Sequence, residues 1–209
     1  MKKTFIKICG ITNSFDALNA FEKGADAIGF MQTKESSRFI PLSDLKLIMH
    51  DIGINHLTVP VFVNPTEDDV YNFLDIFPNS IIQFHGEEEE NFCLKFNKPF
   101  IKAVNFRDKT DLINKLENYK EAHSILIDSG NSLNRGGTGK TFDWKLIPKG
   151  LSKKIIIAGG LNTNNIDRLF EKFTPYGVDV SSGVESQKGV KDSLKVEQFI
   201  NQIKTYEQR

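Results

Sequence analysis

The stretch Phe5-Ile6-Lys7-Ile8-Cys9-Gly10 predicts a short β-strand that ends in a turn. It is mostly apolar, and its glycine is followed by the turn-prone pair Thr12-Asn13. Because side chains alternate along a strand, Lys7 and Cys9 should share one face and the two isoleucines the other. One face therefore ends in a thiol, which is placed for chemistry if the end of the strand opens into a binding site. A small, inert, buried thiol is the alternative.

The same pattern recurs along the chain, where short apolar runs alternate with segments of helical periodicity. Seven further strands are predicted at Asp26–Phe30, Thr58–Val63, Ser80–His85, Phe100–Val104, Ser124–Asp128, Lys154–Ala158 and Gly177–Val180. Helices are predicted to follow the strands, at Ser14–Lys23, after Pro41, after a capping box of Thr66 and Asp69, from Glu87–Glu90 onward, around Leu112–Tyr119, at Asp143–Ile147, at Asn162–Phe173 and at Asp192–Lys204. The apolar faces of these helices, including Leu18, Ile113 and Leu194, should be buried.

Eight strand–helix units predict an α/β fold with a parallel sheet closed into a (β/α)₈ TIM barrel. The chain has 209 residues, fewer than the ~250 typical of this fold, so residues 1–209 should form a single barrel domain. An open, doubly wound sheet is the alternative. It is disfavoured because no glycine-rich dinucleotide loop follows the first strand.

Composition excludes several classes of function. The 27 basic and 27 acidic residues balance, so neither nucleic acid nor an anionic membrane is an expected partner. No apolar run is long enough to span a bilayer, and the first residues lack the apolar core of a signal peptide. Two cysteines, Cys9 and Cys93, do not make a disulfide framework, which favours the cytoplasm. No metal site is expected, and we predict a monomer, with a homodimer as the alternative.

Two loops near the end of the chain predict a phosphate site. Gly159-Gly160 follows the seventh strand and Ser181-Ser182-Gly183 follows the eighth, which is the usual phosphate position of this fold. Such loops can bring backbone N–H groups together around an anion, although simple tight turns are the alternative. The glycine-rich segment Gly136–Gly139 is a candidate third wall or cover.

An acid and a base can be placed at the same end of the barrel. Asp128 ends an apolar strand, where partial desolvation would let it hold a proton near neutral pH; capping a loop is the alternative. With Cys9 as a thiolate it could form a general acid–base pair across a small substrate. Arg38, in a polar loop, is either a solvated charge or a bidentate clamp on a substrate carboxylate.

Several polar residues are predicted to point into the barrel: Lys7, Gln83, Lys102 and Asp179. Because buried charges need partners, we expect Lys7 to lie within salt-bridge reach of Asp179. The acidic run Glu87–Glu90 is interpreted as the first turn of a helix, where negative charge is favourable.

The sequence also resembles a known family, the phosphoribosylanthranilate isomerases. The matching segments run in order along the chain: Lys7–Asn13, Gly24–Phe30, Val61–Asn64, Gln83–Gly86, Gly136–Trp144, Ala158–Leu161 and Gly177–Glu185. The loop 31–38 departs from the usual family sequence before its arginine.

The resemblance implies a (β/α)₈ barrel that isomerises N-(5-phosphoribosyl)anthranilate by an Amadori rearrangement, without a cofactor, in tryptophan biosynthesis. By position, Cys9 resembles the general base, Asp128 the general acid and Arg38 the clamp on the anthranilate carboxylate. The resemblance also implies a phosphate cradle and a pocket lining, formed by Gly159, Gly160, Ser181, Ser182, Gly183, His85 and Asp179. Two alternatives are a bifunctional isomerase that also accepts the histidine-pathway substrate, and a phosphate-binding barrel without catalysis.

Overall fold

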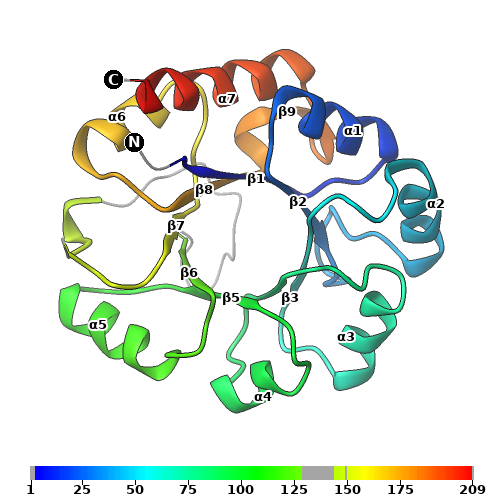
Figure 1. Cartoon of the computed structure of the whole chain (residues 1–209), viewed down its shortest axis with the longest axis horizontal. Helices are drawn as coiled ribbons and strands as arrows, with labels where there is room; N and C mark the ends of the chain where they lie inside the picture. The colour runs from blue at the N-terminus through cyan, green and yellow to red at the C-terminus, as the bar shows by residue number, and fades with distance from the viewer. Residues whose placement is uncertain (1–2, 129–143, 149, 209) are drawn as a thin grey trace.

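The computed structural model describes residues 3–128, 144–148 and 150–208, and it forms a closed barrel of eight parallel strands. Each strand pairs with the next in the sequence, and β8 pairs with β1 (Figure 1). The strands are β1 (Phe5–Cys9), β2 (Ala27–Met31), β3 (Thr58–Phe62), β4 (Ile82–Phe84), β5 (Phe100–Val104), β6 (Ser124–Ile127), β7 (Ile155–Ile157) and β8 (Gly177–Val180). The predicted barrel is confirmed, with strand ends that differ by one or two residues. The predictions for Gly136–Gly139 fall outside the described residues.

The helices surround the barrel (Figure 1). They are α1 (Ser14–Lys23), α2 (Leu42–Ile52), α3 (Glu67–Leu74), α4 (Glu90–Leu94), α5 (Lys109–Asn118), α6 (Ile166–Lys172) and α7 (Ser193–Glu207). Between β6 and β7 the described residues contain a single 3₁₀ turn, η1 (Trp144–Leu146), where a short helix is predicted. After β8 the chain forms a second 3₁₀ turn, η2 (Ser182–Val184), and a small hairpin of β9 (Glu185–Gln187) and β10 (Val190–Lys191).

Local signals mark the ends of several helices, although the helix predicted at Asn162–Phe173 begins only at Ile166 and the last helix extends to Glu207. Thr66 and Asp69 form the reciprocal capping box at the start of α3. At the end of α1, Gly24 adopts a left-handed conformation with φ of 107°, which favours glycine because it has no Cβ. Leu18, Ile113 and Leu194 correct the prediction of buried faces, since 37%, 46% and 68% of each remains exposed.

The core has two layers, one inside the barrel and one between strands and helices. Ile101 and Ala103 of β5 pack in the inner layer, and Phe100 and Val104 pack in the outer one. Lys102 alternates with the inner pair, so it points outward, and the prediction that it faces the barrel interior is wrong. Its charge is accommodated outside the barrel, as described below.

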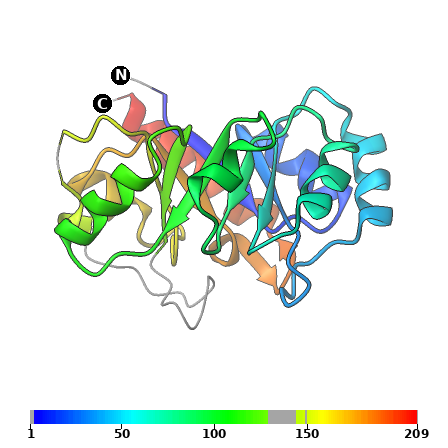
Figure 2. The same ribbon diagram turned by 90° about the horizontal axis from the view of Figure 1, so that it is seen from below.

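The two ends of the barrel differ in character. Figure 2 shows both chain termini at one end and the β9–β10 hairpin, in orange, at the other. The backbone N–H of Thr4 donates to the carboxylate of Glu207, which fastens the termini to each other. The hairpin follows the carboxyl end of β8, so it lies at the end where the strands deliver their last side chains.

Candidate active site

A cavity of about 140 Å³ opens at the carboxyl ends of the strands. It is lined by nearly every residue predicted for the site: Cys9, Arg38, His85, Asp128, Gly159, Gly160, Asp179, Ser181 and Ser182. A larger hollow of about 640 Å³ lies near the amino ends of β7 and β8 and contains none of these residues. Active sites of this fold form at the carboxyl ends of the strands, so the smaller cavity is the candidate.

Lys7 and Asp179 meet at the floor of this cavity. Lys7 Nζ lies 2.9 Å from Asp179 Oδ1, and both side chains are buried, so the predicted ion pair is confirmed. The two residues are directly opposite each other in the β1–β8 register. Each charge offsets the cost of burying the other.

The pKa of Cys9 depends on burial and on two neighbouring charges. Burial raises the pKa of the Cys9 thiol, the charge of Lys7 lowers it, and Asp179 raises it further, with a net shift upward. Lys7 therefore favours the thiolate but does not outweigh burial. The neutral thiol is the resting form at neutral pH.

Gly29 makes room for these groups. It pairs with Cys9 across β1 and β2. A Cβ atom at Gly29 would lie 2.7 Å from Cys9 Sγ and 3.0 Å from Lys7 Nζ, closer than van der Waals contact allows. A glycine at this position is what lets the thiol and the ammonium share the space beside β2.

A second polar group joins Gln83, His85 and Asp128. His85 Nε2 lies 3.5 Å from Asp128 Oδ2, and Gln83 Nε2 lies 3.3 Å from His85 Nδ1. If the Gln83 amide donates to Nδ1, the ring proton sits on Nε2 and faces the Asp128 carboxyl. Gln83 lines the cavity, and its buried Oε1 has no hydrogen-bond partner in the described part of the chain. Gln83 faces the barrel interior as predicted, and its place in the site is a finding of the structure.

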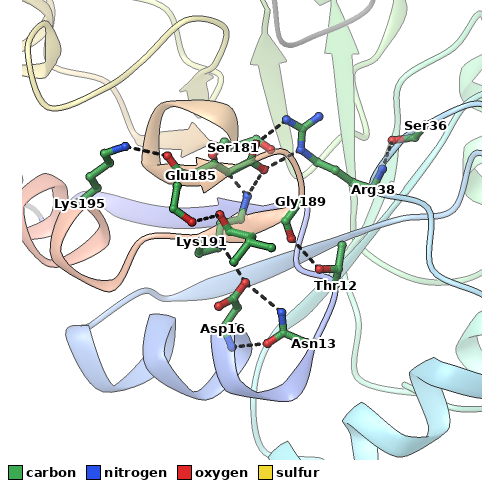
Figure 3. A network of polar contacts seen from close by, with 12 residues as sticks. Thr12, Asn13, Asp16, Ser36, Arg38, Ser181, Glu185, Gly189, Lys191 and Lys195 are labelled. Carbon is green, nitrogen blue, oxygen red and sulfur yellow. Dashed lines mark hydrogen bonds and ion pairs between the residues drawn. The ribbon is translucent and has the colours of Figure 1, made fainter.

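Arg38 reaches the cavity with its guanidinium already paired. Its Nε and Nη2 donate to the two carboxylate oxygens of Glu185, at 2.7 and 2.6 Å (Figure 3). A Cβ atom at Gly10 would lie 2.5 Å from Arg38 Cδ, so the arginine stem crosses a backbone that has no side chain. The bidentate geometry expected of Arg38 is present, but the carboxylate that it binds here belongs to the protein.

Glu185 also binds Lys191, whose Nζ donates to Oε1 at 2.9 Å. Burial would raise the pKa of Glu185, but hydrogen bonds from Arg38 and Lys191 outweigh burial and hold this pKa at about 2, below its usual 4.5. The carboxylate is therefore charged in the folded protein across the whole physiological range.

This shift predicts a loss of stability in acid. A carboxylate whose pKa falls on folding adds stability above its unfolded pKa, and that stability disappears as the pH falls from about 4.5 to about 2. The contribution is at most about 3 kcal/mol in the free energy of unfolding. Urea unfolding of the wild type and Glu185→Gln at pH 6 and pH 3 measures it, and the variant should lose less stability on acidification. Equal losses would contradict the prediction, and Glu197→Gln, which opens the surface pair Glu197–Lys23, is the control.

Glu88 corrects the interpretation of the acidic run. Only Glu90 lies in the first turn of α4, whereas Glu88 is buried and binds Lys102 at 2.8 Å. The Glu88 carboxylate also accepts hydrogen bonds from the backbone N–H groups of Asn64 and Gly86. This ion pair ties the loops after β3 and β4 together beside His85, and no local pattern in the sequence indicated it.

The two glycine-containing loops lie at the cavity as predicted, but their binding of phosphate stays a prediction. Gly159 and Gly160 both have left-handed φ angles, 80° and 65°. Gly183 lies behind the cavity wall, where a Cβ atom would be 1.8 Å from the carbonyl oxygen of Leu161. The loops after β7 and β8 therefore touch through their backbones.

Other features of the site can be stated for the described residues. No three His, Cys, Asp or Glu side chains in residues 3–128, 144–148 and 150–208 gather closely enough to hold a metal ion. Cys9 and Cys93 are both free thiols. Within the same ranges, every helix is too short or too polar to cross a membrane.

Comparison with known proteins gives a consistent result. A family model described as N-(5'-phosphoribosyl)anthranilate (PRA) isomerase matches residues 6–202. The chain is 42% identical over 198 residues to N-(5'-phosphoribosyl)anthranilate isomerase of Legionella pneumophila (strain Paris), covering 95% of this chain and 96% of the relative. The enzyme of Pseudomonas putida (strain W619) is also 42% identical, with the same coverage.

Solved structures agree with these sequence relatives. Phosphoribosyl anthranilate isomerase from Thermotoga maritima superposes with a TM-score of 0.87 at 37% identity, covering 97% of this chain and 99% of that one. Another phosphoribosyl anthranilate isomerase, solved with reduced 1-(o-carboxyphenylamino)-1-deoxyribulose 5-phosphate, gives a TM-score of 0.81 at 34% identity with the same coverage. The family match, the relatives and the cavity agree, and this chain belongs to the N-(5'-phosphoribosyl)anthranilate isomerase family.

Proposed function

We propose that the cavity isomerises N-(5-phosphoribosyl)anthranilate to 1-(2-carboxyphenylamino)-1-deoxyribulose 5-phosphate, with Cys9 as general base and Asp128 as general acid. The isomerisation is a step of tryptophan biosynthesis, and the curated relatives carry the name of this enzyme. The observation that carries the proposal is that one cavity of about 140 Å³ is lined by the thiol, the carboxyl and both glycine-containing loops.

The reaction needs only an acid and a base from the protein. Asp128 gives a proton to the ring oxygen of the ribose, the C1′–O bond breaks, and an iminium forms at C1′. Cys9, as the thiolate, takes the proton from C2′ and leaves an enolamine, which tautomerises to the ketone. The neighbouring Lys7 ammonium stabilises the thiolate when it forms, and Asp179 holds that ammonium in place. No step requires a cofactor.

The ends of the substrate are held by groups at the rim. We assign the phosphate to the backbone of Gly159-Gly160 and Ser181–Gly183, and the anthranilate carboxylate to the remaining N–H groups of Arg38. His85 and Asp179 line the reacting centre. The relative solved with a reduced product analogue supports a ligand of this size and charge.

Turnover of the substrate tests the proposal directly. The purified chain should consume phosphoribosylanthranilate, followed by the loss of its fluorescence. Consumption of the histidine-pathway substrate as well would favour the bifunctional alternative. Binding of a product analogue with no turnover would favour the phosphate-binding barrel and overturn the catalytic assignment.

The pKa of Cys9 predicts how the rate depends on pH. Because burial raises this pKa above its usual value, only a small fraction of the thiol is ionised at pH 7, and that fraction grows as the pH rises. We expect kcat/KM to increase between pH 7 and pH 9 in the wild type. A rate that is flat or falls over this range, with the protein still folded, would contradict a thiolate base of raised pKa.

We also propose the cytoplasm as the compartment, which agrees with two unpaired cysteines and a biosynthetic step. The monomer stays our prediction, with a homodimer as the alternative. One solved Thermotoga maritima relative is described as monomers made from a dimeric enzyme. Analytical ultracentrifugation of the purified chain distinguishes the two states.

A further inference from the structure

We infer that Glu185 and Lys191 are positioning residues that hold Arg38 for a substrate carboxylate and keep its positive charge available. Neither residue is among those that line the cavity, so each acts through its contacts: Glu185 through Arg38, and Lys191 through Glu185 and Ser181. The inference rests on the proposed function, because it assigns the carboxylate of the substrate to Arg38.

The geometry fixes which edge of Arg38 remains for a ligand. Nε and Nη2 each give one N–H to Glu185. Among the described residues, no hydrogen bond from Nη1 is found. A guanidinium has five N–H groups in one plane, so a second carboxylate can approach the Nη1–Nη2 edge while Glu185 keeps the other.

Three segments hold the arginine in this orientation. Its stem crosses Gly10, where any side chain would collide with it. Its backbone N–H donates to the hydroxyl of Ser36. Glu185 holds the head group from the hairpin after β8, and only 16% of the Arg38 side chain is exposed. Little rotational freedom remains to be lost on binding, which favours affinity.

Lys191 restores positive charge that Glu185 would otherwise cancel. Glu185 alone would neutralise Arg38 and remove its attraction for an anionic ligand. Lys191 lies against the same carboxylate with its side chain only 2% exposed, so the cluster holds two positive charges and one negative charge. The cluster keeps a net charge of +1 beside the cavity.

Lys191 also reaches the proposed phosphate loop. Its Nζ lies 3.3 Å from the carbonyl oxygen of Ser181, and its backbone N–H donates to the carboxylate of Asp16 (Figure 3). Asp16 in turn is held by Asn13 at the start of α1. The hairpin therefore connects the carboxylate edge of the site to its phosphate side.

Competition with the substrate for Arg38 is the alternative role of Glu185. A carboxylate already bound to Arg38 could compete with the substrate, so that removing it would strengthen binding. The near-ideal bidentate contact and the additional cation favour positioning over competition. The two roles predict changes of opposite sign in KM.

Steady-state kinetics of Glu185→Gln and Lys191→Met with phosphoribosylanthranilate test the inference. We expect KM to rise about tenfold or more in each variant, with kcat within about threefold of the wild type. Glu197→Gln and Lys23→Met, which open a surface ion pair of the same residue types, should leave both constants unchanged. A lower KM in Glu185→Gln, or a loss confined to kcat, would overturn the inference.

Binding measured without turnover separates this inference from the proposed reaction. NMR titration with benzoate and with inorganic phosphate probes the two ends of the site in each folded variant. Glu185→Gln should weaken benzoate about tenfold and leave phosphate unchanged, whereas Lys191→Met should weaken both. Unchanged benzoate binding would contradict the positioning role, even in a protein that turns over no substrate.

Discussion

Replacing Cys9 with alanine is expected to lower kcat/KM by about 10²–10⁴-fold while the protein stays folded. The change removes the only thiol that lines the cavity, and alanine fits wherever cysteine does. Asp128→Asn should cost a similar factor, because an amide cannot give up a proton to the ribose ring oxygen. Rates with saturating and limiting phosphoribosylanthranilate, together with circular dichroism of each variant, measure the effect.

The chain contains a matched control for this experiment. Cys93 is the second buried thiol, on α4, where burial above all raises its pKa to about 12. Cys93→Ala should reduce stability slightly through lost packing and leave turnover unchanged. If Cys9→Ala kept more than about a tenth of the wild-type rate, the thiol would not be the base.

The architecture could be predicted from sequence because its signals are local. Each strand is a short apolar run next to a helical segment, and capping residues such as Thr66 and Gly24 mark the boundaries. The direction of Lys7 also followed, because Ile6 and Ile8 identify the face of β1 that packs against the helices. Once Lys7 and Asp179 shared the interior, the cost of burying a charge required them to meet.

The direction of Lys102 could not be predicted in the same way. Strands of a parallel barrel are covered on both faces, so β5 is apolar on both sides of this lysine. Alternation then gives two faces without saying which is the inner one. The deciding contact is Glu88, which a sequence pattern assigns equally well to the exposed first turn of a helix.

The partner of Arg38 also could not be predicted from the sequence. Its position in the site was predicted, but its partner Glu185 lies 147 residues further along the chain. Nothing local links the loop after β2 to the hairpin after β8, because only closure of the barrel brings their ends together. The function of the site was therefore more predictable than the network that supports it.

Replacing Gly183 with alanine should be the most damaging single-methyl change in the proposed phosphate loops. The new Cβ would lie 1.8 Å from the carbonyl oxygen of Leu161 and 2.9 Å from Asn162 Cβ, where ordinary contact begins at 3.4 Å. A backbone carbonyl cannot rotate away as a side chain can, so the loops after β7 and β8 have to separate. We expect kcat/KM to fall about 10²-fold, mostly through KM, since a displacement near 1 Å can cost this much.

Gly53→Ala is the control for Gly183→Ala. Gly53 has a left-handed φ of 73°, and a Cβ there would meet nothing within 4 Å. This variant carries backbone strain of about 1–3 kcal/mol without a collision, so it should unfold more easily and turn over substrate normally. Titration with inorganic phosphate then isolates the effect on binding. Gly183→Ala disturbs the contact between the loops after β7 and β8. Normal phosphate affinity in Gly183→Ala would therefore mean that these loops do not hold the phosphate.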